Sequence, residues 1–229
     1  MPVFVLRVWV PDRPGALGAV ASRIGAVRGD LIGIDILERG AGRAIDELVV
    51  ELPDGDLVPL LISEVGQVDG VDVEDVRPAP TTVVDPRLDA LETAALLCEK
   101  GDVDDLLVAL AARASHDGEA EWAAIVDLAD GSSPTSVGTP PPTPWLVAFV
   151  AGSRTSTLVA AAECGPSDVA WAVLPQADLA LVLGRRGRPF RARERRQLAA
   201  VARIADHRWI ELSASAAGAH RSPVAAPRS

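Results

Sequence analysis

Hydrophobic positions in the first part of the chain follow first the spacing of a strand and then that of a helix. Residues 3–10 are rich in β-branched and aromatic side chains and stop at Pro11, which lacks the backbone donor that a strand needs. Gly29 stands where the following helix is expected to end. The apolar residues that recur at helical spacing in between are Leu17, Val20, Ala21, Ile24 and Val27.

The next segment predicts a hairpin, a second helix and a last strand. Residues 31–38 and 43–52 have strand patterns, and Gly40-Ala41-Gly42 joins them. Residues 57–65 show a second helical face, and Val71, Val73 and Val76 mark a last strand. The order βαββαβ predicts a ferredoxin-like fold, in which both helices cover one face of a four-stranded antiparallel sheet.

The loop between the first strand and the first helix has a distinctive sequence. It runs Val10-Pro11-Asp12-Arg13-Pro14-Gly15-Ala16-Leu17-Gly18. A strand, the motif Asp-Arg-Pro-Gly-apolar-Leu and a helix resemble the opening of ACT domains, and the resemblance covers about a third of the chain. It implies a regulatory, ligand-binding ACT-like domain over residues 1–78.

A second domain is expected after a proline-rich linker at residues 79–86. It occupies residues 87–212 and weakly resembles a GAF domain, which is a ligand-sensing fold. The tail, residues 213–229, has little periodicity and is expected to be disordered. The predicted elements of the second domain are helices at 88–97, 106–111 and 191–210, strands at 122–128, 145–150, 168–174 and 179–184, and a loop at 131–144. The predicted fold class is therefore α+β, with an antiparallel sheet in each domain.

The net charge argues against some partners. A formal charge of −10 disfavours a protein that coats nucleic acid or an anionic membrane. Residues 185–196 hold seven arginines and a single acid, Glu194, but this basic island contains only one aromatic residue, Phe190. Stacking partners for single-stranded nucleic acid are therefore scarce, and a solvated helix face is the alternative interpretation. We expect no nucleic-acid partner.

Composition also suggests a compartment. No apolar run approaches the roughly 18 residues of a membrane span. Cys98 and Cys164 are far apart without a second pair, which favours a reducing environment. Lys100 is the only lysine among 22 basic residues, as in proteins from GC-rich bacterial genomes. We expect a bacterial, cytoplasmic protein without a membrane partner.

Catalytic and metal-binding motifs are not evident in the sequence. His116, His207 and His220 are dispersed, and HExxH, GxSxG, GxxxxGK[ST] and GxGxxG do not occur. We therefore expect no enzyme, no metal and no cofactor. An enzyme in the second domain would require a polar pocket with converging titratable groups.

The ACT resemblance implies a ligand site where the loop and the first helix meet a neighbouring subunit. The residues give this site a chemistry. Gly15 lets the backbone approach a ligand, and the amides at the helix N-terminus favour a carboxylate. Asp12 suits an α-ammonium group, and Arg13 suits a bidentate carboxylate contact. The candidate set is Asp12, Arg13, Gly15, Ala16 and Leu17, with Leu31 and Ile32 as side walls.

Two interpretations of this loop remain open. Asp12 alternatively caps the helix, Pro14 begins it and Gly15 permits tight packing, all without a ligand. Leu31 also stands where amino-acid-binding ACT domains often have Asn. The first hypothesis is thus a regulatory homodimer that binds an amino acid between its ACT-like domains, while the second domain reports occupancy. The second hypothesis is a dimeric scaffold whose ACT-like domain binds no ligand.

Overall fold

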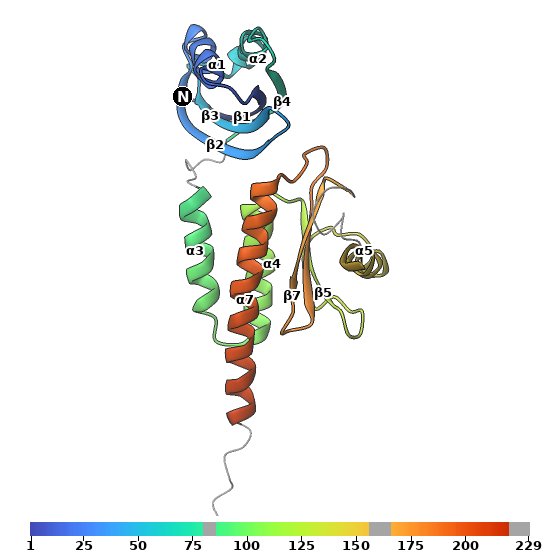
Figure 1. Ribbon diagram of the computed structural model, residues 1–229. Coiled ribbons are helices and arrows are strands. Elements are labelled where there is room, and N and C mark those ends of the chain that lie inside the picture. The colour runs from blue at the N-terminus through green and yellow to red at the C-terminus, as the bar shows by residue number, and fades with distance from the viewer. Residues whose placement is uncertain (80–85, 156–165, 220–229) are drawn as a thin grey trace, which may run out of the picture. The chain divides into compact units, whose positions relative to one another are not determined.

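The computed structural model describes residues 1–79, 86–155 and 166–219 (Figure 1). The chain forms two compact units, of which the first holds Met1–Val84 with Arg191–Arg193 and the second holds the remainder from Asp85 onward. The expected linker lies largely outside the described residues. None of the described helices is long and apolar enough to cross a bilayer.

The first unit has the predicted βαββαβ order. Its sheet is antiparallel with strand order β2-β3-β1-β4, as in a ferredoxin-like fold, so the α+β prediction is confirmed here. Its elements are β1 (Val3–Pro11), α1 (Ala16–Ala26), β2 (Asp30–Gly40), β3 (Arg43–Glu51), a 3-10 turn (Gly55–Leu57), α2 (Val58–Val65) and β4 (Asp72–Pro78).

One face of this sheet carries the core, and Figure 1 shows both helices over it. Leu6, Val8 and Val10 of β1 point toward the helices and are almost fully buried. They pack with Val20 of α1 and Leu61 of α2. Residues paired across an antiparallel ladder share a face, so the register of β1 with β3 also assigns the β3 residues to one side or the other. We call this side the helix-covered face and the other side the open face.

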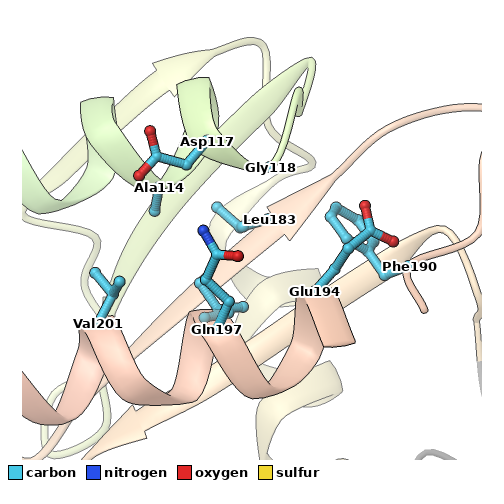
Figure 2. Close-up of a pocket in the computed structure, with 9 residues that line it drawn as sticks. Ala114, Asp117, Gly118, Leu183, Phe190, Glu194, Gln197 and Val201 are labelled. Atoms are coloured by element: carbon cyan, nitrogen blue, oxygen red, sulfur yellow. The ribbon is translucent and has the colours of Figure 1, made fainter. Parts of the chain in front are cut away.

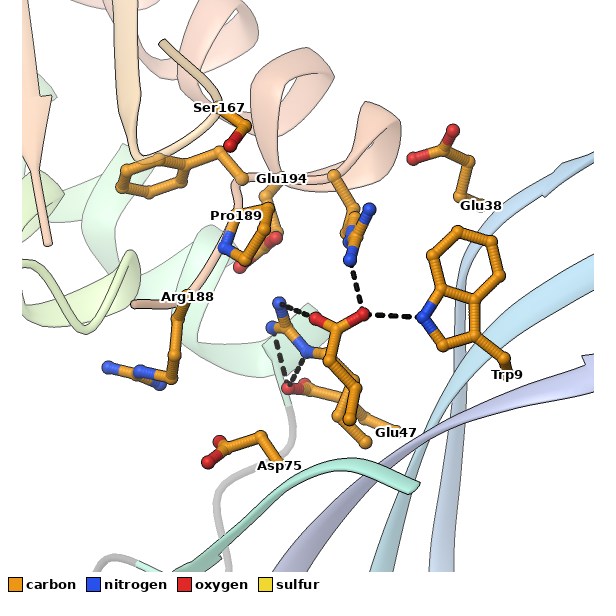
Figure 3. A network of polar contacts seen from close by, with 12 residues as sticks. Trp9, Glu38, Glu47, Asp75, Ser167, Arg188, Pro189 and Glu194 are labelled. Atoms are coloured by element: carbon orange, nitrogen blue, oxygen red, sulfur yellow. Dashed lines mark hydrogen bonds and ion pairs between the residues drawn. The ribbon is translucent and has the colours of Figure 1, made fainter. Parts of the chain in front are cut away.

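The open face carries a network of charged side chains, shown in Figure 3. Nη2 of the buried Arg7 lies 2.7 Å from Oε1 of Glu47, and Nη2 of Arg77 lies 2.9 Å from the same oxygen. Trp9 Nε1 donates a hydrogen bond of 2.7 Å to Oε2 of Glu74. Burial alone would raise the pKa of Glu47, but the two guanidinium groups outweigh it and hold that pKa below its usual range. These contacts hold the charged side chains of the open face in defined positions.

The second unit is a three-layer arrangement around an antiparallel sheet of order β6-β5-β8-β7. Helices α4 and α7 pack on one face of the sheet through one core, and α5 packs on the other face through a second core (Figure 1). Its elements are α3 (Pro86–Cys98), α4 (Val103–Asp117), β5 (Trp122–Asp127), β6 (Thr135–Gly138), α5 (Thr143–Thr155), β7 (Val169–Leu174), β8 (Leu179–Gly184) and α7 (Ala192–Ala219).

Three sequence predictions for this unit were wrong. Residues 145–150 form a helix, not a strand, because Leu146 and Val150 are buried one helical turn apart. Residues 135–138 of the expected loop form β6, which extends the sheet beside β5. Helix α7 continues to Ala219, because the expected tail begins with Ala and Ser residues that tolerate a helix well. The GAF-like resemblance stays a prediction.

Gly184 is a position where the sheet requires the absence of a side chain. It pairs with Trp122, whose indole covers it so closely that an added Cβ would lie 2.1 Å from Cζ2. We expect Gly184→Ala to lower the free energy of unfolding by about 1–3 kcal/mol, through forced displacement of the indole. Thermal or urea unfolding measures it. Gly152→Ala, in open space within α5, is the control and should raise stability by about 0.5–1 kcal/mol. Equal effects of the two substitutions would contradict the packing.

Candidate functional site

The loop from β1 to α1 is held in place by its backbone. The Asp12 amide donates a 2.9 Å hydrogen bond to the Gly42 carbonyl, which ties the loop to the β2–β3 turn. Gly15 precedes α1 with a φ of 84°, in the left-handed region that favours glycine. The loop therefore turns sharply into the helix at Gly15.

The N-terminus of α1 is not satisfied by the protein's own side chains. The cap residue, Gly15, has no side chain to accept a hydrogen bond, and the first turn contains no acidic residue. The interpretation that Asp12 caps this helix is therefore wrong. Asp12 and Arg13 are exposed, and Arg13 only approaches the exposed Asp69 at 4.0 Å, which is a weak contact. The positive end of the helix dipole thus remains available to an anion.

The structure brings together part of the predicted set within one chain. Asp12, Arg13, Gly15, Ala16 and Leu17 are contiguous at this end of the sheet, although Ala16 is buried in the core.

Leu31 and Ile32 lie at the other end of the sheet in the same chain. Leu31 pairs with Val50, and Val50 pairs with Phe4 at the beginning of β1. The loop instead follows the end of β1, where Pro11 pairs with Arg43. Within one chain, the structure therefore does not bring these two predicted side walls to the loop.

Asp46 is a candidate that the sequence analysis did not single out. It pairs with Val8 of β1 and Ile36 of β2, which places it on the helix-covered face. The residue is 4% exposed, yet its Oδ1 accepts no hydrogen bond from the described part of the chain. Burial raises the pKa of Asp46, while the charge of Arg39 lowers it and the charge of Asp12 raises it further. A buried carboxyl group, one oxygen of which has no donor among the described residues, therefore lies near the loop.

Alternation along β3 contained the signal for Asp46. Ala44, Leu48 and Val50 have the same parity as Asp46 and are buried on the helix-covered face. A carboxylate interrupts this otherwise apolar series of side chains. Because burial of a charge is unfavourable, the interruption indicates a role other than core packing.

Strand β2 forms an edge of the sheet and carries exposed apolar side chains. Ile32, Ile34 and Ile36 are 40%, 44% and 40% exposed, and β3 is the only neighbour of β2 among the described strands. The unpaired backbone groups of an edge strand accept a further strand, and the isoleucines offer it an apolar surface.

A separate pocket lies in the second unit, between α4, β8 and α7 (Figure 2). Its walls are mostly apolar, and its acids, Asp117 and Glu194, have partners. The hydroxyl of Thr93 donates a 2.7 Å hydrogen bond to Oδ2 of Asp117, and Nη2 of Arg185 lies 2.6 Å from Oε1 of Glu194. Burial raises the pKa of Asp117 despite this hydrogen bond. The two carboxylates thus serve structural contacts.

The basic island also has structural roles. Arg185 is 3% exposed, donates to the carbonyls of Gly118, Arg188 and Pro189, and stacks over the ring of Phe190 at 4.0 Å. Further arginines of the island bind acids or carbonyls: Arg186 with Glu121, Arg188 with Glu119, and Arg195 with Phe190 and Ser167. No group of His, Cys, Asp and Glu within the described residues is placed to hold a metal ion.

Comparisons with known proteins give limited similarity. No family model matches the chain, and no curated protein matches it. One similar solved structure is the ACT domain of the GTP pyrophosphokinase of Chlorobium tepidum, with 16% identity over 34% of this chain and 100% of that chain, at a TM-score of 0.28. Another is a formyltetrahydrofolate deformylase from Pseudomonas putida KT2440, with 16% identity over 39% of this chain and 36% of that one, at a TM-score of 0.29.

The buried Asp46 carboxylate is expected to cost stability. An acid whose pKa is raised in the folded state destabilises that state above the raised pKa, and the penalty fades as the pH falls through it. We expect the isosteric substitution Asp46→Asn to raise the free energy of unfolding by about 1 kcal/mol at neutral pH, because it removes the buried charge while the side chain stays polar. The gain should shrink in acid. Urea unfolding at several pH values measures it, and a loss of stability at neutral pH would show that the carboxylate has a stabilising partner.

Proposed function

We propose that this chain is a non-enzymatic regulatory protein whose first unit binds an amino acid between two copies of the chain. The observation that carries the proposal is the N-terminus of α1, which follows exposed Asp12 and Arg13 and has no side chain of its own at the cap. The amides of Ala16 and Ala19 donate to the carbonyls of Arg13 and Gly15, which leaves those of Leu17 and Gly18 to bind a carboxylate. The ACT resemblance of the loop supports the same ligand class.

A second copy completes the site. If two β2 strands pair antiparallel around a two-fold axis, the beginning of one strand lies beside the end of the other. Leu31 and Ile32 of one copy then approach the β1–α1 loop of its partner, which accounts for the separation of these residues within one chain. The same pairing places Ile34 and Ile36 beside the partner strand, at the edge of the shared site.

The second unit would report occupancy of the site to the regulated process. A ligand held between copies shifts the population toward the paired state by its difference in affinity for the two states. The sparse cysteines and the arginine-rich composition support a reducing bacterial cytoplasm as the place of action.

One observation favours the scaffold instead. Leu88 and Leu91 of α3 are 54% and 68% exposed, and they lie three residues apart on one side of the helix. Apolar residues in this spacing suit a partner helix. In a scaffold, β2 pairing would form the dimer and α3 would bind another protein.

A ligand screen distinguishes the two functions. We expect one or a few of the common amino acids to raise the thermal midpoint of the full chain in a concentration-dependent way, because a ligand that binds only the folded state stabilises it. Gly15→Ala should abolish the rise, since φ of 84° is unfavourable for alanine and the helix N-terminus would shift. Gly187→Ala, at φ of 71° in the second unit and also in open space, is the matched control and should respond normally. No rise with any amino acid would favour the scaffold.

The dimer has its own test. We expect sedimentation velocity to give a dimer for the wild type and a monomer for Ile34→Lys, because a lysine at the middle of the edge opposes strand pairing. Ile62→Lys places the same charge on an exposed position of α2 and should leave the dimer intact. A monomeric wild type, or a dimer that tolerates Ile34→Lys, contradicts pairing through β2.

A further inference from the structure

The environment of Asp46 points to a ligand group that the protein itself does not supply. An ionised carboxylate buried without a donor is unfavourable, and most buried polar groups in native proteins have a hydrogen-bond partner. Asp46 is 4% exposed, and its Oδ1 has no partner in the described residues. A cationic group bound beside the carboxyl group would offset this cost.

The site is open on one side. Val8, Asp46 and Ile36 are paired side by side across the neighbouring strands β1, β3 and β2. Val8 is fully buried, Asp46 is 4% exposed and Ile36 is 40% exposed. The cover that α1 and α2 provide therefore ends at Asp46. A small molecule seated over Ile36 would lie directly beside the carboxylate.

An unpaired cation lies on the same face. Arg39 pairs with Ala44, the next residue of the same parity as Asp46 along β3. It is exposed and forms no ion pair with Asp46 or any other described residue, although the two charges act on each other. A carboxylate and a guanidinium that are close but not paired match the two charges of an amino-acid zwitterion.

We infer that Asp46 holds the ammonium group of an α-amino acid with an apolar side chain, which lies over Ile36 and Ile34. Arg39 holds its carboxylate group together with the amides at the N-terminus of α1. The inference rests on the proposed function and names its ligand class. The exposed isoleucines supply the apolar wall, and Asp46 replaces Asp12 as the residue that recognises the ammonium group.

The test uses the full chain and three matched probes in isothermal titration calorimetry. L-leucine carries both charged groups, 3-methylbutan-1-amine carries only the ammonium group, and 4-methylpentanoate carries only the carboxylate. We expect Asp46→Asn to weaken leucine and the amine by about tenfold or more and to leave 4-methylpentanoate unchanged. Arg39→Gln should weaken leucine and 4-methylpentanoate and leave the amine unchanged. Arg203→Gln, at an exposed position of α7, is the charge-matched control.

The outcomes separate the inference from the proposed function. Leucine binding that survives both Asp46→Asn and Arg39→Gln overturns the inference and leaves an amino-acid sensor with another site. Binding of the amine alone, dependent on Asp46, supports the cation subsite and contradicts the amino-acid function. A wild type that binds none of the three probes overturns the inference. Urea unfolding of Asp46→Asn and Arg39→Gln under the conditions of the titration shows whether a variant that loses binding is still folded.

Discussion

Oδ1 of Asp46 is buried without a hydrogen-bond donor among the described residues, and the proposed site of the first unit depends on this one unfavourable arrangement. Asp46 cannot leave its position, because it lies within β3 and shares its face with Leu48 and Val50, which are fully buried. A shift of β3 by one residue would turn this whole row outward. Packing of the core therefore keeps the Asp46 carboxyl group buried, and the desolvation of its charge lowers the free energy of unfolding. A stable fold that retains such a cost is expected where the residue serves binding.

The remaining features of the unit converge on the same end of the sheet. The loop turns at Gly15 and presents a helix N-terminus without a capping side chain. Beside it, β2 leaves Ile34 and Ile36 uncovered and Arg39 unpaired within the described residues. Positive, negative and apolar groups thus surround one small region. On the open face and in the second unit, by contrast, arginines such as Arg7 and Arg185 bind carboxylates and carbonyls of the protein itself.

The βαββαβ order could be predicted from the sequence because its strands alternate clearly and its helices are short and amphipathic. Residues 145–150 were wrongly predicted as a strand, since a short apolar run is compatible with either a buried strand or a buried helix. Strand β6 was missed because its pairing with β5 is a tertiary contact that local composition does not encode. Asp46 was visible as a polar residue in an apolar row, but its missing partner became evident only in three dimensions. The distance of Leu31 and Ile32 from the loop also depends on sheet register.

The central claim is that Asp46 binds the ammonium group of a ligand, and the pKa of this carboxyl group tests the claim most directly. Its pKa can be followed through the ¹³C chemical shift of Cγ in a pH titration, with and without a saturating amino acid that binds the protein. The account predicts a pKa above the ordinary range in the free protein, because burial disfavours the charge, and a clear fall on binding, because an ammonium group favours it. A pKa that does not change when the amino acid binds would contradict the claim.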